Sequence, residues 1–203
     1  MIVENASPDN FIADIDSLSK EFKLSSLLKR ANFRKREGFG ASVYTIFRMT
    51  LHSCFFRGNK TVHGNYTSLK QSNNHTSKSS LYRFLSEPRH NWRKLMLLFT
   101  SVVIARIRKL YDKGKRKFCF IVDDSILERP KAKKVELLAR LYDHVFHRYV
   151  KGFNCLQPGW SDGCSYIPVA NALMSSSKSK NGYHDANDEL DHRTCGCRAR
   201  KEA

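Results

Sequence analysis

The sequence predicts an α+β protein with a helical N-terminal region, residues 1–114, and a second region, residues 115–203, that begins with strands. Apolar residues recur at helical spacing through much of the first region, which is typical of amphipathic helices. At about residue 115 the pattern changes to short runs rich in aromatic and β-branched residues, which favour strands. The length of 203 residues suits one ordinary domain or two small ones.

Helices are expected first over residues 9–57, where apolar positions repeat every three or four residues. Gly38 and Gly40 interrupt this pattern and indicate a break between helices. Residues 58–76 are polar and rich in Gly, Asn and Ser, which indicates a loop.

The next helix is predicted over SLYRFLSE, with Ser77 or Ser79 as its N-cap and Pro88 at its end. Residues 91–112 predict a long amphipathic helix with basic residues near its C-terminus. Short helices joined by basic loops suit a DNA-binding module, and they suit a plain helical bundle almost as well.

The second region predicts three strand segments with a helix between the first two. FCFIVDD, residues 118–124, is typical of a buried strand, and residues 131–144 have local helical character. Residues 146–157 and 164–174 are strand candidates, and PGWSDGC, residues 158–164, is a cluster of turn residues between them. Two strands joined by a tight turn form an antiparallel hairpin.

Pro168 has no backbone N–H to donate to a neighbouring strand, so the last of these strands is expected at a sheet edge. From Ser175 onward the apolar periodicity is lost, which indicates a loop or a frayed tail. Trp160 is interpreted as anchoring the turn and not as a base-stacking residue.

The charge balance predicts a polyanionic partner. Lys and Arg number 36 against 19 Asp and Glu, which gives a formal net charge of +17. Nucleic acid is the first interpretation, an anionic membrane surface the second, and a solvated basic surface without a partner the third. Candidate DNA-contacting residues are Lys29, Arg30, Arg34, Lys35, Arg36, Lys115, Arg116, Lys117, Lys131, Lys133 and Lys134.

Several classes of protein are disfavoured. The sequence has no apolar run long enough for a transmembrane helix and no secretory signal at its N-terminus, so neither is expected. With nucleic acid as the first interpretation of the charge, the expected partner is DNA and not a membrane. The absence of a G-x-x-x-x-G-K-[ST] motif disfavours an ATP-driven enzyme. The six scattered cysteines are typical of reduced cytosolic thiols: Cys54, Cys119, Cys155, Cys164, Cys195 and Cys197.

Asp123 and Asp124 are the candidate chemical groups, because carboxylates at the end of a central strand commonly hold a divalent metal such as Mg²⁺. Two such ions can activate water and stabilise the leaving oxygen in phosphodiester cleavage. The alternative is that Asp-Asp-Ser forms a turn or cap. Alternation along a strand places Asp124 with Val122 on one face and Asp123 with Ile121 on the other.

Two further constellations are weaker. The spacing of four C-terminal residues matches no common zinc pattern, although they could be assembled into a site: His184, His192, Cys195 and Cys197. His144 and His147 lack the Glu of a zincin motif and are interpreted as surface histidines.

Residues 118–177 resemble the start of the catalytic domain of bacterial insertion-sequence DDE transposases, in the branch with an RNase H-like core interrupted by a β-rich insertion. The resemblance rests on strand-D-D-S followed by KKVELLAR and by KGF…GWSDG, and extends more weakly to SLYRFLSEPRHNW. It implies an RNase H-like sheet in which the first three strands are antiparallel. It also implies a two-Mg²⁺ (or Mn²⁺) site held by Asp, Asp and Glu, which cleaves transposon ends and joins them to target DNA. Asp124, which precedes Ser125, corresponds to the first Asp, and Asp123 takes this place if the alignment shifts by one residue.

The resemblance also implies that the second Asp and the Glu lie beyond the segment present here. No Y-x2-R-x3-E-x6-K arrangement occurs, and the roles are not carried over to the later acids, Asp185, Asp188, Glu189 and Asp191. The expectation is therefore an incomplete RNase H-like domain in a truncated transposase that is inactive alone. We expect it in the bacterial cytoplasm at the nucleoid, where it could associate with itself or with a full-length transposase. The alternatives are a small Mg²⁺-dependent nuclease that uses Asp124 with local acids, and a non-enzymatic DNA-binding module or inhibitor of a full-length relative.

Overall fold

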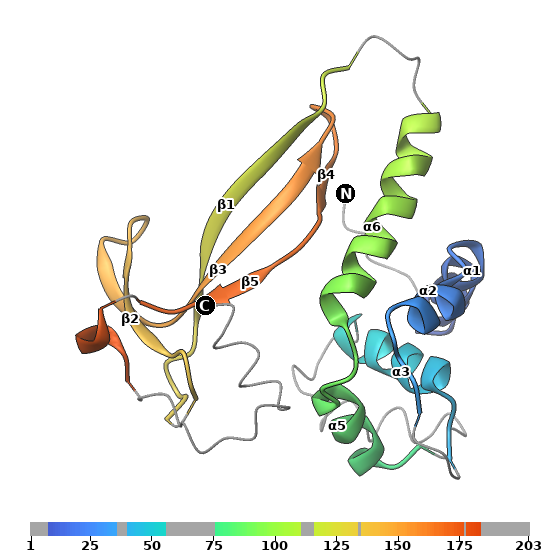
Figure 1. Ribbon diagram of the computed structural model, residues 1–203, viewed down its shortest axis with the longest axis horizontal. Coiled ribbons are helices and arrows are strands. Elements are labelled where there is room, and N and C mark those ends of the chain that lie inside the picture. Colours follow the sequence, from blue (N-terminus) through green and yellow to red (C-terminus); the bar gives the residue numbers. More distant parts are fainter. Residues whose placement is uncertain are drawn as a thin grey trace. The chain divides into compact units, whose positions relative to one another are not determined.

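The computed structural model describes residues 8–35, 40–55, 76–110, 116–133, 135–176 and 178–183. The chain divides into two compact units, residues 1–99 and residues 100–203. The described residues form five helices and an antiparallel sheet of five strands, so the α+β class is confirmed (Figure 1).

The helices lie where apolar spacing predicted them. The bounds are α1 Pro8–Glu21, α2 Leu24–Arg30, α3 Val43–Phe55, α5 Lys78–Ser86 and α6 Trp92–Lys109. A left-handed residue, Lys23 with φ of 50°, separates α1 from α2. None of the helices in the described ranges is long and apolar enough to cross a membrane.

Helix α5 begins at the predicted cap. The Ser77 hydroxyl oxygen accepts the Ser80 N–H over 3.2 Å, so Ser77 is the N-cap and not Ser79. The helix ends at Ser86, two residues before Pro88, as expected because the residue before a proline disfavours helical angles.

An aromatic cluster forms the centre of the first unit. Phe33 follows α2, and its ring lies 4.4 Å from the His90 ring, 5.8 Å from Phe84 and 4.8 Å from Trp92. Phe47 of α3 lies 6.2 Å from Phe33 in an edge arrangement. Edge and offset contacts of this kind add to the hydrophobic gain from burying the rings, so the cluster ties the end of α2 to α3, α5 and α6.

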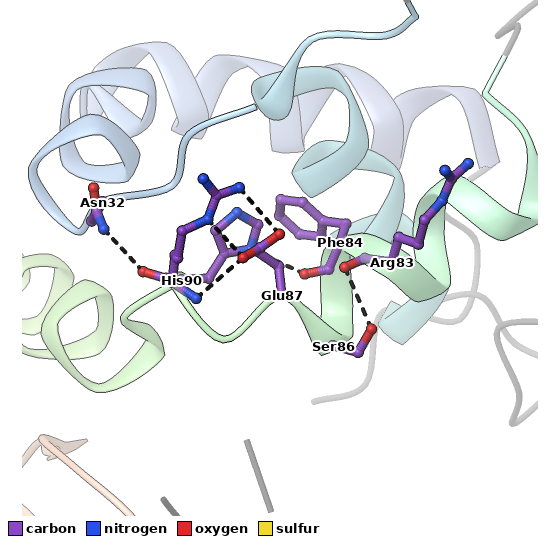
Figure 2. A network of polar contacts seen from close by, with 7 residues as sticks. Asn32, Arg83, Phe84, Ser86, Glu87 and His90 are labelled. Atoms are coloured by element: carbon purple, nitrogen blue, oxygen red, sulfur yellow. Dashed lines mark hydrogen bonds and ion pairs between the residues drawn. The ribbon is translucent and has the colours of Figure 1, made fainter. Parts of the chain in front are cut away.

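Polar contacts hold the α5–α6 turn against this cluster (Figure 2). His90 Nδ1 lies 3.0 Å from the Phe84 carbonyl oxygen, and Asn32 Nδ2 donates to the Arg89 carbonyl over 3.2 Å. Arg89 also pairs with Glu87 over 2.8 Å, within the same turn. The turn is therefore fixed to the residues that follow α2 by hydrogen bonds as well as by ring packing.

The second unit contains a sheet built around one long strand. Its strands are β1 Cys119–Glu128, β2 Ala139–Asp143, β3 Arg148–Ser161, β4 Tyr166–Pro168 and β5 Ala172–Met174. β1 pairs along one side of β3, and β2, β5 and β4 pair along its other side, all antiparallel. The predicted antiparallel hairpin is confirmed, and β4 pairs only with β3 in the described residues, as expected for a strand that carries Pro168.

The helix predicted over residues 131–144 is wrong, because the end of this segment is strand β2. Its Lys, Glu, Leu and Ala residues favour a helix locally, but pairing with β3 decides the conformation. Leu138 and Ala139 are fully buried at the start of β2, which shows that packing outweighs local propensity here.

The predicted turn over residues 158–164 is also wrong in its first half. Residues 158–161 belong to β3, and the turn begins at Asp162, whose Oδ1 accepts the N–H groups of Cys164 and Ser165 over 3.0 and 2.6 Å. Arg116 pairs with Asp162 Oδ2 over 2.9 Å. These partners hold the pKa of the Asp162 carboxyl below its usual value, and the hydrogen bond from the Ser165 N–H has the largest effect. Trp160 therefore lies in the strand before the turn, where it is buried and stacks on Phe118.

The prediction that residues 118–124 form a buried strand is correct for the strand and wrong for its burial. β1 continues to Glu128, so Asp123 and Asp124 lie in mid-strand and not at its end. Phe120 is 75% exposed and Val122 65% exposed. β1 also pairs only with β3 among the described residues, so the backbone groups of its other edge are open as well.

The segment after Ser175 is more ordered than expected as far as residue 183. A single 3₁₀ turn spans Ser179–Asn181, Gly182 bridges to Ala139, and the Tyr183 N–H donates to the Leu138 carbonyl over 2.9 Å. These contacts place Tyr183 beside β2.

Candidate functional site

The candidate site is built on the middle of β1, opposite the centre of β3. Asp123 pairs with Gln157 and Asp124 with Leu156 in the strand register. Alternation along the strand puts the two carboxylates on opposite faces of the sheet, as predicted. Only one of them can therefore line any given site.

The side chain of Asp124 has one direct polar partner on the neighbouring strand. Asn154 Nδ2 donates to Asp124 Oδ2 over 3.0 Å. Asn154 lies two residues from Leu156 and so shares the face that Asp124 occupies. Asp124 is exposed, so a cation can reach its carboxylate.

Asp123 has a different role in the structure. Its Oδ1 accepts the backbone N–H of Asp124 over 3.0 Å. That N–H points away from β3. The Arg129 N–H donates to the Lys151 carbonyl, so the backbone N–H and C=O groups of the odd-numbered residues of β1 face β3 and those of the even-numbered residues face the open edge. Asp123 therefore satisfies one backbone N–H of the open edge, while the Asp124 carboxylate stays available for a ligand on its own face of the sheet.

The residues around Asp124 fit one part of a hard-cation site. Asn154 Oδ1 is buried and accepts no hydrogen bond. A carboxylate beside an amide oxygen without a donor supplies the oxygen ligands that Mg²⁺ and Mn²⁺ prefer. Among the residues the structure describes, no group of three His, Cys, Asp or Glu side chains is placed to hold a metal.

Of the two weaker constellations, one lies outside the described residues and the other lies on the surface. His184, His192, Cys195 and Cys197 lie outside the described residues. His144 and His147 are both exposed in the turn between β2 and β3, which agrees with their interpretation as surface histidines.

The predicted DNA-contacting residues lie mainly on exposed positions. In the first unit Lys29, Arg30, Arg34 and Lys35 are exposed at the end of α2 and after it. In the second unit the exposed ones are Lys117, Lys131 and Lys133. Arg116 is only partly exposed because it pairs with the buried Asp162, and Arg36, Lys115 and Lys134 lie outside the described residues.

Sequence reasoning missed two groups of residues. Asn154 has no local motif, and only the register of β1 against β3 brings it to Asp124. The second group is a set of exposed basic residues on α5, on α6 and in the turn between them: Arg83, Arg89, Arg93 and Lys94. The signal for these was present in SLYRFLSEPRHNWRK, where basic residues alternate with the core positions of the helices.

Comparison with known proteins gives one finding. The family model described as DDE superfamily endonuclease matches residues 46–196, which is more than half of the chain. No curated protein and no solved structure matches the chain.

Proposed function

Because the chain belongs to the DDE superfamily endonucleases, we propose that it acts on DNA as a transposase-type protein, with Asp124 as the first carboxylate of a divalent-metal site. The single observation that carries this proposal is the place of Asp124. It lies inside the matched segment, on an exposed face of β1, beside an amide oxygen that lacks a donor.

In this proposal Asp124 and Asn154 would hold Mg²⁺ or Mn²⁺ through hard oxygen ligands. When bound, the metal supplies Lewis-acid stabilisation of a phosphodiester oxygen and a more acidic water. The chain's own contribution is to fix the carboxylate: Asn154 orients Oδ2 of Asp124, and Asp123 holds the strand edge beside it.

The basic residues would bring DNA to the protein. Exposed cations on the first unit include Lys29 and Arg30 on α2 and Lys94 on α6. Each phosphate that a Lys or Arg neutralises releases counterions from DNA, so binding by this route weakens as salt rises. The net charge of +17 supports this part of the proposal.

The test is nicking of supercoiled plasmid by the full chain with Mn²⁺. A wild type that binds Mn²⁺ through Asp124 without nicking would instead agree with the expectation from the sequence that the chain is inactive alone. Nicking that needs Mn²⁺, disappears in Asp124→Asn and persists in Asp123→Asn supports the proposal. The Asp123 variant is the matched control, because it removes the neighbouring carboxylate on the opposite face. Nicking that persists in Asp124→Asn contradicts the role of Asp124.

A DNA-binding role without cleavage is the second candidate, and the excess of basic residues favours it. Duplex binding without nicking, with an affinity that falls steeply as salt rises, supports this candidate. An affinity that does not change with salt contradicts the phosphate-contact argument that both candidates share.

A further inference from the structure

The hairpin of β2 and β3 has one face of buried residues and one face of aromatic and basic residues. Ala139 is fully buried and Val150 is 8% exposed on the core side. The register pairs Tyr142 with Tyr149 and Arg140 with Lys151, which places these four residues together on the other face. Tyr183 joins them, because its ring lies 4.5 Å from Lys151 Nζ.

These five residues, which we call the hairpin platform, alternate aromatic rings with cations. Tyr142 and Tyr149 have ring centroids 5.1 Å apart, and the Arg140 guanidinium lies 3.8 Å from the Tyr149 ring. No member carries a negative charge. The nearby acid, Asp143, is buried and its Oδ1 accepts the N–H groups of Val145 and Phe146.

The rings are open to solvent despite these contacts. Tyr149 is 60% exposed, Tyr183 43% and Tyr142 39%. Exposed aromatic rings that gather in one patch often mark an interaction site, and the cations beside these three rings favour an anionic partner.

We propose that the hairpin platform binds single-stranded DNA, with unpaired bases stacking on its tyrosines and Arg140 and Lys151 contacting the adjacent phosphates. Aromatic rings bind single strands because every base presents a flat face, while basic side chains follow the backbone. In a duplex those faces are covered by neighbouring base pairs, so the platform discriminates for unpaired strands. This inference goes beyond the proposed metal chemistry and needs no metal.

The test is fluorescence anisotropy of labelled oligothymidylate with the full chain, in EDTA and at low salt. The double variant Tyr142→Leu/Tyr149→Leu is expected to bind roughly 5- to 150-fold more weakly, the effect of losing one stacked base. The variants Tyr142→Phe and Tyr149→Phe keep the ring and should keep the affinity. Duplex binding should be unchanged in all of them.

The matched control is Tyr82→Leu on α5. Tyr82 is 46% exposed and has Lys78 Nζ 5.9 Å from its ring, so it is an exposed tyrosine with a cation outside the platform. Its substitution should leave oligothymidylate binding unchanged. Wild-type affinity in the Leu double variant, or equal losses for single strand and duplex, would overturn the proposal.

Two further measurements cover the other outcomes. If the Leu variants do not fold, as judged by circular dichroism, photocrosslinking of bromodeoxyuridine-substituted strands to the wild-type chain replaces them. Crosslinks at Tyr142, Tyr149 or Tyr183 support the proposal, and crosslinks confined to residues outside the platform contradict it. Tighter binding of oligouridylate than of oligothymidylate would overturn the choice of DNA over RNA.

The EDTA condition separates this inference from the proposed function. Loss of nicking in Asp124→Asn with intact oligothymidylate binding supports both. Metal-dependent nicking that persists in Asp124→Asn, together with loss of single-strand binding in the Leu double variant, contradicts only the role of Asp124.

Discussion

The side-chain amide of Asn154 donates a hydrogen bond to Oδ2 of Asp124 across the β1–β3 pair, over 3.0 Å. Its other polar atom, Oδ1, is buried and has no donor. Asn154 is thus the one described side chain that both orients the proposed metal carboxylate and offers a second oxygen beside it.

Replacing Asn154 should therefore weaken metal binding. Loss of a residue that orients a metal ligand typically costs roughly 10–100-fold in affinity, and we expect a loss of this size for Asn154→Ala. Titration of Mn²⁺ followed by electron paramagnetic resonance measures it. Gln157→Ala is the control, because Gln157 lies opposite Asp123 on the other face of the sheet. Equal effects of the two substitutions would refute the specific role of Asn154.

The close approach of β1 and β3 depends on Gly152. A Cβ at this position would lie 2.4 Å from the Leu127 carbonyl oxygen and 3.1 Å from the Glu128 Cα, both backbone atoms that cannot turn away. Gly152→Ala is expected to lower the free energy of unfolding by about 1–3 kcal/mol, the usual cost of forcing extra volume into a packed site.

Gly159→Ala is the control for that substitution. The three atoms nearest to its Cβ would belong to the ring end of Tyr166, an exposed side chain that can swing aside. Urea denaturation of both variants tests the comparison. A larger loss of stability for Gly159→Ala than for Gly152→Ala would contradict the role assigned to the backbone contact.

His90 should make the first unit sensitive to acid. Its ring is buried between Phe33 and Phe84, and burial lowers the pKa of His90 below its usual value, despite the opposing effect of the Phe84 carbonyl. The unfolded chain then binds the proton more readily than the folded one. The stability that depends on a neutral His90 is therefore fully present above the pKa of His90 in the unfolded chain. It falls as the pH drops from about 6.5 toward the lower folded value.

Thermal unfolding between about pH 7 and about pH 5 measures this effect. The melting temperature of the wild type should fall over this interval, and His90→Phe, which keeps an aromatic ring in the cluster, should fall less. His144→Phe is the control, because His144 is exposed in the β2–β3 turn. A wild-type profile parallel to that of His90→Phe would show that His90 does not carry the pH dependence.

The parts of the fold that depend on local signals could be predicted from the sequence. The Ser77 cap and the apolar spacing of α5 specify that helix within a few residues, because a cap and the side chains it serves are neighbours in the chain. The alternation that separates Asp123 from Asp124 is equally local, so the two faces of β1 were predicted correctly.

The parts that depend on long-range pairing could not be predicted. The segment before Asp143 has the composition of a helix, and only β3, placed later in the chain, makes it a strand. Asn154 reaches Asp124 through the same kind of pairing, thirty residues apart in sequence. The exposure of β1 likewise depends on what packs against the faces of the sheet and not on its own apolar residues.

We propose Asp124, and not its neighbour Asp123, as the metal-binding carboxylate of this member of the DDE superfamily endonucleases. The most direct measurement is Mn²⁺ binding, followed by electron paramagnetic resonance, in the wild type, Asp124→Asn and Asp123→Asn. We expect Asp124→Asn to abolish Mn²⁺ binding at the site and Asp123→Asn to retain it. Loss of binding in Asp123→Asn with retention in Asp124→Asn would contradict it.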